Sequence, residues 1–80
     1  MNRYVATFHT HVAAARSRRS LQEAGVEAQY APVPRALSAN CGTCVLYQAE
    51  EPLLSRMDRD AAAVALITAE NSYQILFRNQ

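Results

Sequence analysis

The chain has 80 residues, which is enough for one domain with a single core and excludes a multidomain enzyme or a site between two lobes. Half of the residues are hydrophobic, but fifteen of those forty are alanine, so the core is thin and a second copy would add stability. Eight arginines nearly balance seven acids, and the net charge of +1 predicts no binding to nucleic acid or to an anionic membrane. We treat residues 1–80 as one domain and expect a homodimer.

The longest apolar run, residues 61–67, has seven residues, where a membrane-spanning helix needs about 20. No apolar secretion signal follows Met1, so the sequence predicts a cytoplasmic protein. A reducing compartment disfavours a purely structural disulfide. The two cysteines of the chain, Cys41 and Cys44, are therefore the first candidates for a functional site.

The first strand, the first helix and the second strand have clear signals in the sequence. Residues 3–8 alternate with period two and predict a strand. Thr10 can cap a helix that ends at Gly25, because its apolar residues follow helical spacing. Residues 26–30 alternate again and predict a second strand, which stops at Pro32 because proline cannot donate to a strand partner.

Residues 43–48 predict a third strand, with Cys44 on one face and Val45 on the other. The following segment, residues 50–60, fits either a helix that starts at Pro52 or a loop that ends in an aspartate cap at position 58 or 60. We favour the loop.

The alanine-rich segment 61–69 predicts a second helix that stops at Asn71. Residues 73–77 predict a last strand with Ile75 and Phe77 on one face. The order strand, helix, strand, strand, helix, strand predicts an α+β, ferredoxin-like plait, in which a four-stranded antiparallel sheet carries two helices on one face.

This topology brings distant segments together. A right-handed crossover makes the first two strands parallel, with the third strand between them. Residues 9–12, Pro32 and residues 41–44 should then meet at one end of the sheet, where the cysteines face the start of the first helix. The sheet face opposite the helices should be uncovered, and Val5, Leu46 and Leu76 are the candidate homodimer surface on it.

The segment 32–44 carries the most specific chemistry in the sequence. Its two prolines fix two φ angles, and Ser38 and Asn40 favour turns. Gly42 permits a positive φ beside Cys41. These features predict that the Cys41 thiol lies on a tight, exposed corner.

A nucleophilic cysteine must be a thiolate, which requires solvent access and nearby positive charge or convergent N–H groups. Arg35 and the first helix, which starts at Thr10, can supply both, so we predict a reactive Cys41. Cys44 is either a core residue or a resolving thiol. If residues 41–44 are extended, the two Cα atoms lie ~10 Å apart, too far for a disulfide, whereas a turn at Gly42 would let them bridge.

A characteristic set of features occurs in the first half of the chain: a strand ending at Phe8, a helix from Thr10 to Gly25, Pro-Val-Pro-Arg at 32–35, Ser38 and Cys41-Gly42. This combination resembles the selenium/sulfur (Se/S) carrier protein-like domain family. Cys41 matches the proposed carrier cysteine of the family, and Arg35 matches the arginine of its Pro-x-Pro-Arg motif. Cys44 lies outside that pattern.

The resemblance implies a carrier of sulfane sulfur or selenium, held on Cys41 as a persulfide or selenopersulfide and passed between donor and acceptor proteins. It implies a carrier or accessory protein more than a stand-alone enzyme, and we expect no cofactor. Arg35 is expected to stabilise the anion. The residues expected to shape the site are Pro34, Ser38, Asn40, Gly42 and Thr10. As a further hypothesis, Cys44 attacks the loaded sulfur and releases it, which leaves a Cys41–Cys44 disulfide.

Two other functions remain open: a small thiol–disulfide redox protein that uses Cys41 and Cys44, and a non-catalytic interaction module. His9 and His11 could join the cysteines around zinc, but a one-residue histidine spacing is unlike structural zinc sites, so we predict no metal. Three arginines of the first helix, Arg16, Arg18 and Arg19, form either a solvated face or a docking patch for an acidic partner or a neighbouring copy.

Overall fold

The computed structural model describes residues 1–37 and 42–79. This part of the chain contains one α-helix, a short 3-10 turn and five strands: β1 (Asn2–Phe8), α1 (His11–Glu23), β2 (Ala28–Ala31), β3 (Thr43–Ala49), η1 (Leu54–Arg56), β4 (Ala61–Ala69) and β5 (Ser72–Arg78). The strands form one antiparallel sheet in the order β2-β3-β1-β4-β5. The α+β class is confirmed, but the predicted plait of four strands and two helices is wrong.

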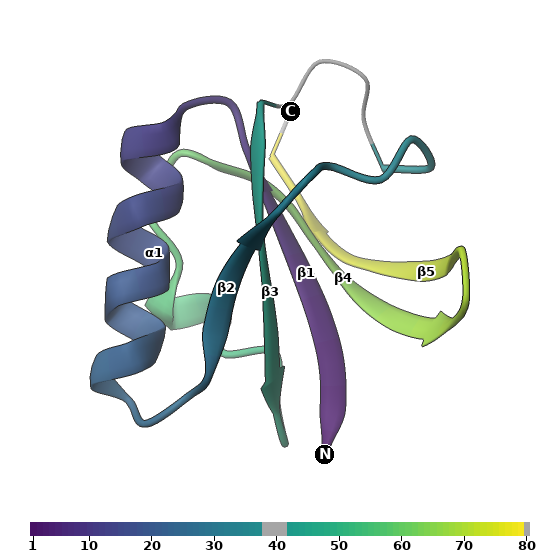
Figure 1. Ribbon diagram of the computed structural model, residues 1–80, viewed down its shortest axis with the longest axis horizontal. Helices are drawn as coiled ribbons and strands as arrows, with labels where there is room; N and C mark the ends of the chain where they lie inside the picture. The colour runs from purple at the N-terminus through teal and green to yellow at the C-terminus, as the bar shows by residue number, and fades with distance from the viewer. Residues whose placement is uncertain (38–41, 80) are drawn as a thin grey trace.

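The elements form layers around the sheet. Helix α1 covers one face, and the segment after β2 and the bent β4–β5 hairpin lie on the other side (Figure 1). No helix in the described ranges is long and apolar enough to cross a membrane.

Both ends of α1 follow the predicted signals. Thr10 Oγ1 accepts a hydrogen bond from the Ala13 amide at 3.2 Å. At the other end Gly25 has a φ of 81°, and its amide donates to the Gln22 carbonyl at 3.0 Å. The amide of Val26, the residue after Gly25, donates to the Leu21 carbonyl at 3.0 Å, which completes a Schellman motif. The capped helix is therefore encoded locally.

The two glycines of the chain differ in what an added side chain would cost. Gly25 has a φ of 81°, in the left-handed region that side chains disfavour. A β-carbon at Gly42 would make only ordinary contact, 3.8 Å from the His9 carbonyl oxygen. Gly25→Ala should therefore lower the free energy of unfolding by about 1–2 kcal/mol, whereas Gly42→Ala should leave it nearly unchanged. Urea titrations of both variants test this contrast, and equal losses would contradict it.

The predicted arrangement of the first three strands is confirmed. β1 and β2 each pair antiparallel with β3, so they are parallel to each other with β3 between them. β2 starts at Ala28, two residues later than predicted. Residues 26 and 27 instead connect the end of the helix to the strand.

The segment before β4 is a loop, as favoured from the sequence, and the helix at Pro52 is wrong. It contains only the short turn η1, and Asp58 Oδ1 accepts from the Asp60 amide at 3.0 Å. The Asp58 amide donates to Ser17 Oγ at 2.8 Å, and Ser17 is buried in α1. This hydrogen bond ties the loop to α1 just before the chain enters β4.

Residues 61–69 form a strand, so the predicted second helix is wrong. β4 pairs with β1 on one side and β5 on the other, and its first five residues are buried. A strand buried on both faces needs apolar residues at every position, which the run 61–67 supplies. Asn71 has a φ of 61° in the turn that leads into β5, so it forms a hairpin rather than ending a helix.

β5 also differs from its predicted pattern. Ile75 pairs with Ala65 and Phe77 with Val64, so the register shifts at Leu76. Because neighbouring residues of β4 point to opposite faces, Ile75 and Phe77 do too. The prediction that they share a face is wrong.

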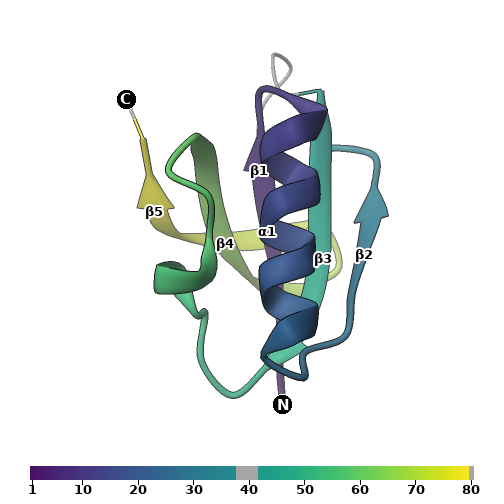
Figure 2. The ribbon, with the colours of Figure 1, turned by 90° about the vertical axis from the view of Figure 1, so that its left-hand side faces the viewer.

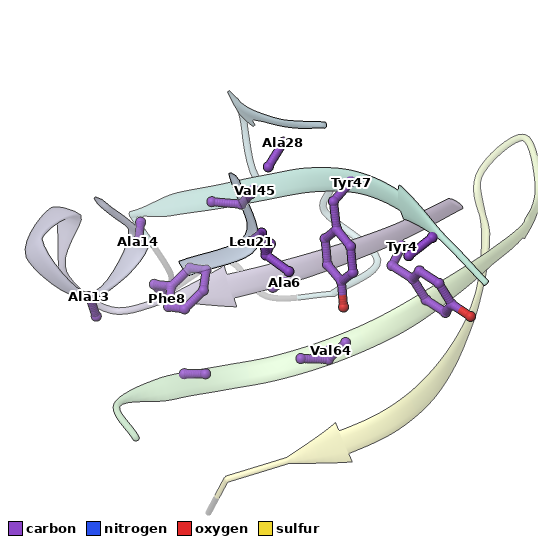
Figure 3. Packing of buried hydrophobic residues seen from close by; sticks show 12 residues of the cluster. Tyr4, Ala6, Phe8, Ala13, Ala14, Leu21, Ala28, Val45, Tyr47 and Val64 are labelled. Carbon is purple, nitrogen blue, oxygen red and sulfur yellow. The ribbon is translucent and has the colours of Figure 1, made fainter. Parts of the chain in front are cut away.

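The core lies between α1 and the sheet. The view in Figure 3 shows Phe8, Val45 and Leu21 together there, and all three have no exposed surface. Many of their neighbours are alanines, including Ala6 and Ala14. This composition brings the helix close to the sheet, and it concentrates the buried volume in a few large side chains.

The second face of the sheet is covered, which corrects the proposed dimer surface. Val5 has no exposed surface, because Val33, Leu37 and the β4–β5 hairpin pack over its cluster. Leu46 belongs to the same cluster and is half-buried. Leu76, in contrast, is 36% exposed on the edge strand. The three residues therefore do not form one open surface.

Tyr47 is expected to make the stability of the fold depend on alkaline pH. Burial raises the pKa of Tyr47 far above its ordinary value, and the adjacent Tyr4 adds to the shift. Its hydroxyl donates to the Pro52 carbonyl at 2.5 Å. Because the pKa is higher in the folded than in the unfolded chain, this contribution to stability is complete below about pH 10 and is lost as the pH rises further.

Urea titrations at about pH 8 and about pH 11 measure this effect. The wild-type protein should lose stability between them, and Tyr47→Phe should lose less. Tyr30→Phe is the control, because Tyr30 is 40% exposed. An equal alkaline loss in Tyr47→Phe and the wild type would contradict the assignment.

Candidate functional site

Three segments meet at one end of the sheet, as the topology predicted. Thr43 at the start of β3 lies opposite Phe8 at the end of β1, and Ala31 at the end of β2 lies opposite Cys44. Gly42 is close to the His9 carbonyl, immediately before the start of α1. Figure 2 shows the starts of α1 and β3 at the same end of the molecule. Residue 42 is therefore beside the amino end of the helix.

The amino end of α1 offers positive potential at this place. The first amides of a helix have no acceptor within it, and the helix dipole is positive there. Thr10 binds the Ala13 amide and fixes the start of the helix at His11. No acidic residue occupies the first turn. The end of the helix is thus suited to stabilise an anion.

The proline segment is held against the sheet and carries Arg35 outward. Val33 and Leu37 pack on the second face, and the Leu37 amide donates to the Pro34 carbonyl at 3.0 Å. Arg35 lies in the resulting turn and is exposed. Pro32 and Pro34 also line one wall of a groove of about 520 Å³, whose opposite wall is the β4–β5 hairpin.

Cys44 lies inside the sheet rather than on the surface. Its side chain has no exposed area, and Sγ is placed to donate to the Ala31 carbonyl at 3.1 Å and the Pro32 carbonyl at 3.3 Å. Carbonyl oxygens stabilise a protonated thiol and oppose a thiolate. Of the two roles expected for Cys44, this environment favours core packing.

Three predicted site residues, Ser38, Asn40 and Cys41, lie outside the described residues. Their roles stay predictions. The described residues that flank them are Leu37, which is anchored on the second face, and Gly42, which is beside His9. The two ends of the segment are thus fixed at the same end of the sheet.

The two histidines have different surroundings. The His11 ring packs against Tyr30 with a centroid distance of 5.1 Å, while His9 is exposed before the helix. Within residues 1–37 and 42–79, no group of three or more histidine, cysteine, aspartate or glutamate side chains could hold a metal ion.

The three arginines of α1 point to different surroundings. Arg16 is 3.6 Å from Asp58 in an ion pair. Arg18 lies over the Tyr30 ring, 4.8 Å from its centroid, and donates to the Ala28 carbonyl at 3.2 Å. Arg19 is exposed. Two of the three thus contact their own chain, while Arg16 and Arg19 stay exposed, so docking of an acidic partner stays a prediction.

Sequence reasoning missed Thr7. It is 1% exposed, and its hydroxyl oxygen has no hydrogen-bond partner among the described residues. In the sequence it is an ordinary β-branched residue of a strand, so only its hydroxyl at a buried position could have signalled a polar site.

The described geometry defines a small α+β domain with a cysteine-bearing segment between β2 and β3. Residues 3–57 match the family model described as "Putative Se/S carrier protein-like". This match covers more than half of the 80 residues, and the chain belongs to that family. The predicted resemblance is confirmed. The match ends before the β4–β5 hairpin, and searches of the curated proteins and of the solved structures found no match.

Proposed function

We propose that this protein carries sulfane sulfur or selenium on Cys41, as a persulfide or selenopersulfide, and passes it to a partner protein. The observation that supports this most is the position of Gly42 beside the start of α1 in a member of the Se/S carrier-like family. The residue before it is the family's expected carrier cysteine. An anion beside residue 42 would be next to a helix end that favours negative charge.

The chemistry balances without a cofactor. The Cys41 thiolate attacks the terminal sulfur of a donor persulfide, the donor S–S bond breaks, and the donor leaves as a thiolate. Cys41 then holds a persulfide, and an acceptor thiolate removes its outer sulfur by the same reaction in reverse. Arg35 and the amides at the start of α1 stabilise the anionic states. The protein acts as a carrier between two partners, and no net oxidation occurs.

We assign Cys44 to packing during loading. A resolving thiol must become a thiolate and reach the loaded sulfur. Cys44 is buried on the second face with its sulfur close to two carbonyl oxygens, and both conditions would require the start of β3 to open. This burial also weighs against the alternative function as a thiol–disulfide redox protein.

The partners are sulfur or selenium donor and acceptor proteins, and a homodimer is part of the proposal. The second face is covered, so the edge strand β5 offers the more accessible apolar surface: Ile75, Leu76 and Phe77 are each 36–39% exposed. Pairing of two copies along this edge would cover them. A monomer in light scattering would remove the dimer without affecting the carrier function.

A two-step transfer assay tests the function. The reduced protein is incubated with glutathione persulfide, separated from the donor, and mixed with a small acceptor thiol. We expect sulfur to stay with the protein after separation and to leave when the thiol is added. The same protein with its thiols blocked by iodoacetamide is the control. Failure to retain sulfur after separation would refute the carrier function.

A further inference from the structure

A row of side chains crosses all five strands on the face opposite α1. The strand registers place Thr7 of β1 between Cys44 of β3 and Ala63 of β4. At the two ends of the row, Ala31 of β2 lies opposite Cys44 and Arg78 of β5 lies opposite Ala63. Directly opposed residues of antiparallel strands share a face. A hydroxyl and a guanidinium are thus separated only by an alanine, so the arginine can reach across it.

Among the residues that the structure describes, the buried Thr7 hydroxyl has no hydrogen-bond partner, although buried polar groups normally have one. Leaving a buried hydroxyl unpaired costs free energy, and valine would fill the same space without that cost. A bound ligand that uses this hydroxyl would explain why threonine is tolerated there.

Thr7 also lines a small pocket. Its volume is about 160 Å³, several times the ~30 Å³ share of one water molecule. The pocket is lined by Thr7, His9, Leu37, Ala62, Ala63, Arg78 and Asn79. These residues include a guanidinium, an imidazole, a hydroxyl and a carboxamide, all of which can donate hydrogen bonds. None of the described lining residues is acidic, so the pocket suits an anion.

We propose that this pocket binds a small sulfur oxyanion that carries a transferable chalcogen, namely thiosulfate or its selenium analogue selenosulfate. Arg78 supplies the charge, and the Thr7 hydroxyl and His9 imidazole donate to the sulfonate oxygens. Two alanines leave room for the ligand. His9 links the pocket to the cysteine-bearing segment between β2 and β3, because the His9 carbonyl lies beside Gly42. The anion is thereby held at the base of that segment.

The role of the anion rests on the proposed function, whereas its binding does not. The Cys41 thiolate attacks the sulfane sulfur of thiosulfate, the S–S bond breaks, and sulfite leaves with the bonding electron pair. Cys41 then holds the persulfide. Selenosulfate gives the selenopersulfide and the same leaving group, so both substrates balance without an added oxidant or reductant.

Binding is tested by titrating thiosulfate at constant ionic strength and following backbone amide signals by NMR. The wild-type protein should show saturable shifts at Thr7, Ala63 and Arg78. Thr7→Val and Arg78→Gln should each weaken binding by roughly tenfold or more. Arg56→Gln is the charge-matched control, because Arg56 is exposed in η1, and it should bind as the wild type does.

Thr7→Val has a second readout that separates a ligand site from a packing defect. Without ligand it should unfold at a higher temperature than the wild type, because the unpaired hydroxyl is gone. Higher stability with weaker thiosulfate binding supports the proposal. No saturable binding, or equal binding in all four proteins, overturns it.

Comparing thiosulfate binding with loading of the protein by thiosulfate and by glutathione persulfide distinguishes the two proposals. If thiosulfate binds but neither thiosulfate nor glutathione persulfide loads the protein, the pocket stands and the carrier function fails. If glutathione persulfide loads the protein but thiosulfate does not bind, the carrier function stands and the pocket proposal fails.

Discussion

Replacing Phe8 by alanine should lower the free energy of unfolding by about 3–5 kcal/mol. Phe8 has no exposed surface and packs in the core cluster with Leu21 and the alanines of α1. These small neighbours cannot fill the space that the ring leaves. A domain has only about 5–15 kcal/mol of stability in total, so the variant should be close to unfolding.

Urea titration followed by circular dichroism measures this loss. Val12→Ala is the matched control, because Val12 also lies near the start of α1 but is 58% exposed. It should change the free energy of unfolding by less than about 0.5 kcal/mol. A loss below about 1 kcal/mol in Phe8→Ala would mean that the core does not depend on this ring.

Cys41→Ala should abolish loading by a persulfide donor, and Cys44→Ala should retain it. The first variant removes the nucleophile. The second removes a buried sulfur and should mainly lower stability, by about 1 kcal/mol. Intact mass after donor treatment, together with a urea titration, separates the two effects.

The same pair of variants also tests the resolving role of Cys44. If Cys44 resolves the loaded sulfur, Cys44→Ala should accumulate the persulfide and should no longer form an internal disulfide. Equal rates of sulfur release in the wild type and Cys44→Ala would instead support packing alone. Loading that persists in Cys41→Ala would contradict the assigned carrier residue.

The first part of the fold could be predicted because its signals are local. The Thr10 cap and the Gly25 motif each depend on contacts within a few residues, and both are present. The alternation at Cys44 and Val45 also placed these residues correctly on opposite faces. Proline ended β2 near its predicted position for the same local reason.

The second half could not be predicted in this way. A short run of apolar residues such as 61–67 fits a buried helix or a buried strand equally well. The choice depends on β1 and β5, which lie far away in the sequence and pair with both edges of β4. Non-local packing also covers Val5. The sheet face opposite α1, which the sequence predicted to be uncovered, therefore carries a second buried cluster.

The candidate site was predictable as a motif and only partly as a geometry. The segment between β2 and β3 resembles its family in sequence, and the strand order places its two ends together. The Thr7 pocket depends on residues from β1, β4 and β5 that meet only in the sheet. No pattern within one segment indicated that meeting.

The most direct test of the carrier function locates the transferred atom. The reduced protein is treated with glutathione persulfide, its free thiols and persulfides are alkylated, and its peptides are analysed by mass spectrometry. We expect one additional sulfur atom between the alkyl group and the Cys41 side chain, and none on Cys44. An additional sulfur on Cys44, or on neither residue, would contradict the account.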